Sequence, residues 1–329
     1  MYYVVRIRTQ TITTDLRMIT RLSYSGMAKT LTEFSRPFIA YNILGKISPV
    51  LAGFKVTHKC NLKCRHCPYW ERTGDELSFE GVLSTLQTMR RMGVKILIFE
   101  GGEPLLWHDG KNSLSDVIRE AKKLFPCVCM TTNGIISWSH IPVDRVWVSL
   151  DGPPAVHDLI RGKGKFDIVW KNLESSDPCR TLISTTINRL NLDAVPELIS
   201  MLRGLIAGVT IQFHYPYRGL PDPLFVSPPD RKEVLEELIG LKRSGYPVAN
   251  SVNSLQELKK ERWTCEDRLL ANAEPDGSVY HGCYLKNRGI AECSYCGFAA
   301  HNEISLAFKM KWESIRTGMK IFFTGNTAE

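Results

Sequence analysis

Two groups of cysteines constrain this chain more than any other feature. Three of them follow the spacing C-x3-C-x2-C, at Cys60, Cys64 and Cys67, and four more lie between residues 265 and 296. The first ten residues are polar and β-branched and do not resemble a secretion signal, so we expect a cytoplasmic protein. Cytosolic thiols stay reduced, and clustered cysteines in such a protein indicate metal sites rather than disulfides.

Composition predicts an ordinary folded protein. The chain has 329 residues, of which 43% are hydrophobic and 23% are charged, so a sizeable core is possible. The net charge of +8 permits an anionic substrate, but we find no nucleic-acid-binding motif and expect no nucleic-acid partner. No apolar run approaches the ~20 residues that a membrane span needs.

From residue 52 onward, apolar strands alternate with amphipathic helices. This alternation predicts an α/β fold with parallel strands and crossover helices, and six strands fit a partial (βα)6 TIM-like barrel better than a complete one. The expected strands are 54–57, 95–99, 127–132, 146–150, 181–187 and 209–213, and the expected helices are 79–92, 115–124, 166–173, 195–205 and 232–241.

The pattern divides the chain into three parts. Residues 1–51 form a basic leader, in which residues 14–44 have helical spacing interrupted at Gly26 and Pro37. Its apolar stretch 38–44 is expected to dock on the main domain, with peripheral membrane contact as the alternative. Residues 52–261 form the barrel, and residues 262–329 form a small Cys-rich extension that ends in a helix over 306–319.

The first cysteine group is suited to an iron–sulfur cluster. Cysteine thiolates are the usual ligands of a 4Fe–4S cluster, and three cysteines leave one of the four irons open to an external ligand. The alternative is a zinc ion, for which His66 or His58 would supply the fourth ligand.

The spacing of Cys60, Cys64 and Cys67 resembles the signature of the radical SAM superfamily. That resemblance implies a catalytic 4Fe–4S cluster whose open iron is chelated by S-adenosylmethionine (SAM). In that family the residue before the third cysteine is usually aromatic and lies near the adenine, and His66 occupies the position here.

A second motif follows the strand predicted at 95–99. Gly101 and Gly102 allow close approach of the backbone to a ligand, and Pro104 fixes the turn. A Gly-Gly pair alone is most often just a turn. Together with Glu103, the stretch resembles the superfamily's GGE motif, which implies that it holds the amino group of SAM.

Polar residues follow the next strands at the same end. By resemblance to related proteins with C-terminal cluster domains, Ser149, Asp151 and Arg161 belong to the SAM site, with Ser149 and Arg161 on the carboxylate. The plainer interpretation is that Asp151 caps a helix and Arg161 is a solvated charge. By the same resemblance, Thr185, Thr186 and Asn188 at the end of the fifth strand are candidates for the ribose, with a helix or turn cap as the alternative for Asn188.

The second cysteine group has the spacing C-x17-C-x9-C-x2-C. Its four thiolates suit either zinc or a second 4Fe–4S cluster. The segment resembles the superfamily's twitch or SPASM-like extension, which favours an auxiliary 4Fe–4S cluster that transfers electrons. Its cysteines are Cys265, Cys283, Cys293 and Cys296.

The resemblance implies an enzyme that cleaves SAM reductively to a 5′-deoxyadenosyl radical and abstracts hydrogen from an unactivated C–H bond. It also implies a one-electron donor such as ferredoxin or flavodoxin. The substrate stays open between a peptide, a cofactor precursor and a lipid. The alternatives are a zinc-stabilised binding protein without catalysis and a simple iron–sulfur electron carrier.

Overall fold

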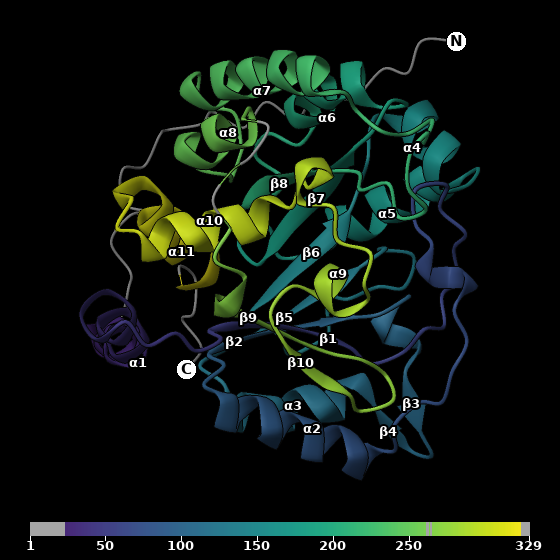
Figure 1. The fold of residues 1–329 in the computed structure, drawn as a ribbon. Coiled ribbons are helices and arrows are strands. Elements are labelled where there is room, and N and C mark those ends of the chain that lie inside the picture. The colour runs from purple at the N-terminus through teal and green to yellow at the C-terminus, as the bar shows by residue number, and fades with distance from the viewer. Residues whose placement is uncertain (1–23, 261–262, 264, 324–329) are drawn as a thin grey trace.

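The computed structural model describes residues 24–260, 263 and 265–323. A single large sheet dominates the described part of the chain, with strand order β10-β9-β1-β2-β5-β6-β7-β8 (Figure 1). Neighbouring strands from β1 to β8 pair in parallel, which confirms the predicted α/β fold. These strands are β1 (Leu51–Lys55), β2 (Ile96–Glu100), β5 (Cys127–Thr132), β6 (Arg145–Ser149), β7 (Thr181–Ile187) and β8 (Gly208–Phe213).

Helices cover the outer side of the sheet (Figure 1). The helix α2 begins at its cap Ser78, whose side chain accepts from the backbone of Gly81, and ends at Gly93 with φ of 110°. The helices that follow the strands are α2 (Phe79–Met92), α3 (Leu114–Leu124), α4 (Pro154–Arg161), α5 (Lys165–Glu174), α6 (Val195–Met201), α7 (Pro228–Arg243) and α8 (Val252–Leu258). The sequence did not predict α4 or α8, and α6 ends earlier than expected. A short hairpin, β3 (His108–Asp109) and β4 (Asn112–Ser113), precedes α3.

The C-terminal segment joins the main sheet. Strand β9 (Leu270–Ala273) pairs in parallel with β1, and β10 (Val279–His281) pairs antiparallel with β9. Neither strand was predicted, because each is short and lacks a run of β-branched residues. The sheet therefore continues past residue 261, and the cysteine-bearing loops are anchored on the barrel edge. A short helix, α9 (Tyr284–Asn287), follows β10.

The predicted final helix over 306–319 is wrong. Two helices stand there, α10 (Ala299–Phe308) and α11 (Trp312–Phe323). The chain turns between them at Met310, whose φ of 60° lies in the left-handed region and cannot continue a helix. The apolar spacing runs through this turn, which is why the sequence pattern did not reveal it.

The predicted interruption of the N-terminal helix is also wrong. Helix α1 (Tyr24–Leu44) runs through both Gly26 and Pro37, and the earlier part of residues 14–44 lies outside the described residues. The ring of Phe308 lies 5.7 Å from Phe38 and 5.5 Å from Tyr41, so packing offsets the loss of a backbone donor at Pro37. These contacts confirm that the stretch 38–44 docks on the main domain through Phe38 and Tyr41, whereas Ile43 and Leu44 at its end stay exposed.

No helix among the described residues combines the length and the apolar character that crossing a membrane requires.

Candidate functional site

The three cysteines of the first group share one cavity. They lie on the loop after β1, and Cys60, Cys64 and Cys67 all line a cavity of about 520 Å³ inside the sheet. Backbone bonds from Arg65 to Ile160 (3.0 Å) and from Cys67 to Cys64 (3.1 Å) hold the loop. Among the described residues, no three His, Cys, Asp or Glu side chains converge on a position for one metal ion. A 4Fe–4S cluster binds each thiolate on a different iron, so thiols around a shared space suit it.

The surroundings of these thiols combine burial with nearby polar donors. Burial raises the pKa of all three, that of Cys67 to about 11, so without a metal the protonated form predominates at neutral pH. Nη1 of Arg161 lies 3.8 Å from Sγ of Cys64, and Nδ2 of Asn133 lies 3.9 Å from Sγ of Cys60. Metal binding would release the thiol protons, and these donors would stabilise the resulting charge.

Gly101 and Gly102 fit the loop between β2 and the cysteines. A Cβ atom would lie 2.6 Å from the carbonyl oxygen of Thr57 at Gly101 and 2.3 Å from that of Lys59 at Gly102. The amides of Gly102 and Glu103 donate to these same carbonyls, at 2.9 and 2.8 Å. Glycine is required here because two stretches of backbone are in contact. Both glycines also line the cavity, so the close approach to a ligand that the sequence predicts stays possible.

Glu103 is fully buried and bonded within the protein. Its carboxylate accepts from the amide of Asn133 (2.8 Å) and from Oγ1 of Thr132 (2.9 Å). Burial raises its pKa to about 7. Neither Glu103 nor the buried Pro104, which begins a short 3-10 helix, is among the residues that line the cavity. Glu103 therefore positions the loop whose Asn133 side chain reaches Cys60.

Asp151 and Arg161 form a buried ion pair beside the cysteines. Nε of Arg161 lies 2.6 Å from Oδ2 of Asp151, and the two side chains are 8% and 0% exposed. Burial alone would raise the pKa of Asp151, but the guanidinium of Arg161 holds it below its usual value. The other carboxylate oxygen accepts from the amide of Thr186 at 2.9 Å. Arg161 is thus a fixed charge in the cavity wall rather than the solvated charge of the plainer interpretation, and Ser149 lines the same wall.

His66 is a further titratable group of this wall. Its Nδ1 lies 3.9 Å from Oδ2 of Asp151, and within the described structure this nitrogen has no hydrogen-bond partner. Burial lowers the pKa of His66 to about 4, so the ring is neutral at pH 7. A neutral ring with an unpaired nitrogen at a cavity is available to a ligand.

Thr185 and Asn188 point away from the cavity. Oγ1 of Thr185 donates to the carbonyl of Leu150 at 2.8 Å, and Oδ1 of Asn188 accepts from the amide of Leu190 at 2.9 Å, as a turn residue would. Neither lines the cavity, whereas Thr186 does, together with Gln212 on the neighbouring strand. The strand register pairs Ser149, which faces the cavity, with Ser184. Because side chains alternate along a strand, Thr186 also faces the cavity and Thr185 faces away, a distinction that requires the register.

An aromatic and charged group lies between the two cysteine groups. Nζ of Lys55 lies 3.0 Å from Oε2 of Glu100 and 4.8 Å from the ring centre of Tyr284. The hydroxyls of Tyr217 and Tyr284 are 3.1 Å apart. All four residues line the cavity, and so does Tyr215.

The second cysteine group lies next to this aromatic wall. Cys283 is buried in a cluster with Tyr215 and Phe298, and Cys296 packs against it. Burial raises the pKa of both Cys265 and Cys296 to about 12, and the other thiols of the group contribute to each. The loop is fixed to the barrel, since Nη1 of Arg231 on α7 donates to the carbonyl of Cys296 at 3.0 Å. Cys265 and Cys293 are exposed.

Comparison with known proteins agrees with this geometry. Residues 54–213 match the family model of the radical SAM superfamily. The AdoMet-dependent heme synthase of Oleidesulfovibrio alaskensis is 30% identical over 169 residues, which cover 47% of this chain and 42% of that protein. The mycofactocin maturase MftC of Mycolicibacterium smegmatis is 29% identical over 170 residues, 48% of this chain and 42% of that protein. The matched segment thus spans less than half of either relative.

The fold also matches solved structures. Crystal structures of SuiB from Streptococcus suis include one with a TM-score of 0.59 at 13% identity, covering 88% of this chain and 70% of that chain. The SAM-bound structure named anSMEcpe has a TM-score of 0.56 at 19% identity, covering 82% of this chain and 88% of that chain. The fold of this chain is therefore like that of these structures, and the family model of the radical SAM superfamily matches residues 54–213.

Proposed function

We propose that this protein is a radical SAM enzyme whose catalytic 4Fe–4S cluster is bound by Cys60, Cys64 and Cys67. The observation that carries the proposal is that all three thiols line one cavity together with Arg161 and His66, at the carboxyl end of parallel strands. Ligand sites of parallel α/β folds lie at this end of the strands.

Held by Cys60, Cys64 and Cys67, the cluster would supply the one-electron reduction of SAM, which breaks its C5′–S bond to give methionine and a 5′-deoxyadenosyl radical able to take a hydrogen atom from a substrate C–H bond. The protein's own residues bind and orient. Arg161 is held by Asp151 with its charge toward the cavity, where it suits the carboxylate of SAM. His66 lines the same space, and its ring, whose Nδ1 has no hydrogen-bond partner within the described structure, suits the adenine.

The neighbouring loops position the cysteine segment. Glu103 fixes Asn133 beside Cys60, and the glycine pair closes against the backbone before the cysteines. Ser149, Gly101 and Gly102 line the wall of this space and are proposed to contact SAM. Thr185 and Asn188 do not line this space and instead hydrogen-bond to the backbone next to it.

We further propose that Cys265, Cys283, Cys293 and Cys296 bind an auxiliary 4Fe–4S cluster in a twitch-like extension. Cys283 and Cys296 pack in one cluster, and Arg231 fixes the backbone of their loop. With four protein ligands such a cluster would transfer electrons rather than bind substrate. A protein donor such as ferredoxin or flavodoxin would supply the first electron.

The experiment uses anaerobically purified and reconstituted protein. We expect about eight irons per chain and formation of 5′-deoxyadenosine when SAM and dithionite are added. The triple variant Cys60→Ala, Cys64→Ala and Cys67→Ala should lose SAM cleavage, whereas the exposed Cys179→Ala should keep it. SAM cleavage by the triple variant, or a protein that binds only zinc, would reject the proposal. Zinc at the second group alone would reject only the auxiliary cluster.

A further inference from the structure

The cavity changes character along the strands. At the amino end of the sheet its wall is formed by Leu51, Ile96, Ile98 and Trp147. At the carboxyl end, where the cysteine loop lies, the strands contribute Lys55, Glu100, Thr131, Ser149 and Thr186. On β1, β2 and β6 the apolar residues that face the cavity come earlier in the strand than the polar residue that faces it, and the parallel register aligns these strands. The barrel interior therefore offers an apolar end opposite the polar SAM end.

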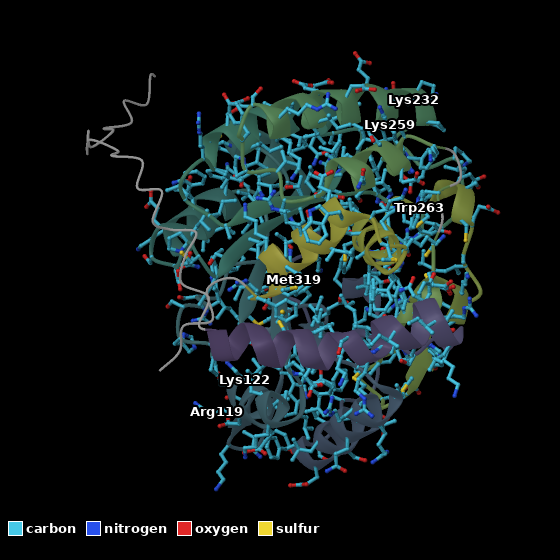
Figure 2. All side chains as sticks on the ribbon, turned by 90° about the vertical axis from the view of Figure 1, so that its left-hand side faces the viewer. Arg119, Lys122, Lys232, Lys259, Trp263 and Met319 are labelled. Carbon is cyan, nitrogen blue, oxygen red and sulfur yellow. The ribbon has the colours of Figure 1, made fainter. Side chains whose placement is uncertain are left out.

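Three helices close the apolar end. Nε of Arg145, at the start of β6, donates to the carbonyl of Ile321 on α11 at 2.6 Å, and the rings of Phe34 on α1 and Phe323 on α11 are 5.0 Å apart. Figure 2 shows α1 running across this face, next to the helix that carries Met319. Their residues in the cavity wall are Phe34, Phe38, Ile304, Phe308, Ile315 and Met319.

Some polar groups in this part of the cavity are bonded within the protein, whereas His301, which lies toward Lys55 and Glu100, and Glu303 each have an atom that is unpartnered among the described residues. Asn250 bonds through both amide atoms to the backbone of Ile211, and Ser314 bonds to Ser251 at 2.9 Å. Nδ1 of His301 and Oε1 of Glu303 have no partner within the described structure. Burial lowers the pKa of His301 to about 4 and raises that of Glu303, so both side chains are biased toward their neutral forms. Apart from these two unpartnered atoms, the wall formed by α1, α10, α11 and the amino ends of the strands is apolar and suits a hydrocarbon chain.

The outer side of the same helices is apolar and basic. Ile43 and Leu44 at the end of α1 are 73% and 61% exposed, and Met310 and Trp312 in the α10–α11 turn are 64% and 74% exposed. Nδ2 of Asn42 donates to the carbonyl of Phe308 at 3.2 Å, which brings the two segments together. Their exposed lysines are Lys46, Lys309 and Lys311. Exposed large apolar side chains flanked by lysines are typical of surfaces that bind anionic membranes.

We infer that the substrate is a membrane lipid, taken from an anionic bilayer at the α1 and α10–α11 surface, with one hydrocarbon chain in the apolar end of the cavity. The inference rests on the proposed function, since the cysteine loop would act on a C–H bond of that chain. It follows from two separate observations, the apolar wall inside these helices and the apolar basic surface outside them.

Gly318 on α11 provides a sharp test of the chain site. It lines the cavity, and an added Cβ would have no heavy atom within 4 Å, so a larger side chain can project into the cavity without a clash at its base. Gly240 on α7 is a matched control, because it is helical, equally open and exposed, and does not line the cavity. Replacing either glycine in a helix should not weaken the fold.

The probe is tritium-labelled stearic acid, measured by equilibrium dialysis against the reconstituted protein. We expect saturable binding by the wild type and by Gly240→Phe, and a loss of about tenfold or more in Gly318→Phe, as expected when a few buried methylene groups are displaced. No saturable binding by the wild type, or equal binding by the two variants, would overturn the chain site.

A second arm tests the membrane source. We expect the wild type to float with phosphatidylglycerol vesicles and not with phosphatidylcholine vesicles. Ile43→Asp and Trp312→Asp should each reduce flotation, whereas Ile168→Asp, which changes an exposed residue of α5, should not. Stearate binding without vesicle binding would overturn the membrane source. SAM cleavage is measured on the same wild-type sample, and its absence in a protein that binds both probes would overturn the proposed function instead.

Discussion

The buried pair of Asp151 and Arg161 gives the most direct test of how the site is built. Arg161→Met removes the cation and leaves a fully buried carboxylate that, among the described residues, accepts from the amide of Thr186 and has Nδ1 of the neutral His66 3.9 Å away. Breaking a buried pair in this way costs about 3–5 kcal/mol, because an uncompensated charge is left in a low-dielectric site. We expect the apparent free energy of unfolding, measured by urea denaturation at pH 7, to fall by that amount.

Two further variants separate stability from binding. Asp151→Asn combined with Arg161→Met leaves no buried charge, so it should recover much of the lost stability while SAM binding stays weak. Lys123→Met removes one partner of an exposed pair with Glu120, whose side chains are 68% and 38% exposed, and should change stability by less than about 1 kcal/mol.

The pH dependence of the pair has a defined sign. Because the folded pKa of Asp151 is lowered, its contribution is complete above the ordinary aspartate pKa of about 4 and is lost as the pH falls through the folded value. A loss of stability in Arg161→Met no larger than in Lys123→Met, or a double variant less stable than Arg161→Met, would refute this account of the pair.

Two more predictions concern the loop after β2. Burial raises the pKa of Glu103 to about 7, so the unfolded chain loses the proton of this group at a lower pH than the folded protein does. The free energy of unfolding of the metal-free wild type should therefore fall by about 3 kcal/mol as the pH rises from about 4.5 to 7, at about 1.4 kcal/mol for each pKa unit. Glu103→Gln should lack this dependence in urea denaturation, and a variant with the wild-type pH profile would contradict the prediction. Gly102→Ala places a Cβ 2.3 Å from the carbonyl oxygen of Lys59, so this variant should lose about 1–3 kcal/mol of stability and bind less iron on reconstitution. Gly240→Ala, which meets no neighbour within 4 Å, should do neither. Normal iron content in Gly102→Ala would contradict the prediction.

The sequence by itself determined the order of the central elements and predicted the chemistry that we propose. The spacing of Cys60, Cys64 and Cys67 limits the loop to one cluster-sized site, and the alternation of apolar strands with helices predicted the parallel sheet. Helix α2 and the strands β5 and β7 have the predicted bounds because each combines a strong apolar pattern with a clear start and end. These are local properties, so they can be read from neighbouring residues.

Only the tertiary structure decided which side chains reach the cavity and what closes it. Thr186 rather than Thr185 faces inward because of the strand register, and Glu103 turns to Asn133 rather than to the cavity because the loop packs on the cysteine segment. The short strand β9 forms by pairing with β1, and α1 and α11 meet across the amino end of the sheet. These outcomes depend on contacts between residues far apart in the chain, which no local pattern contains.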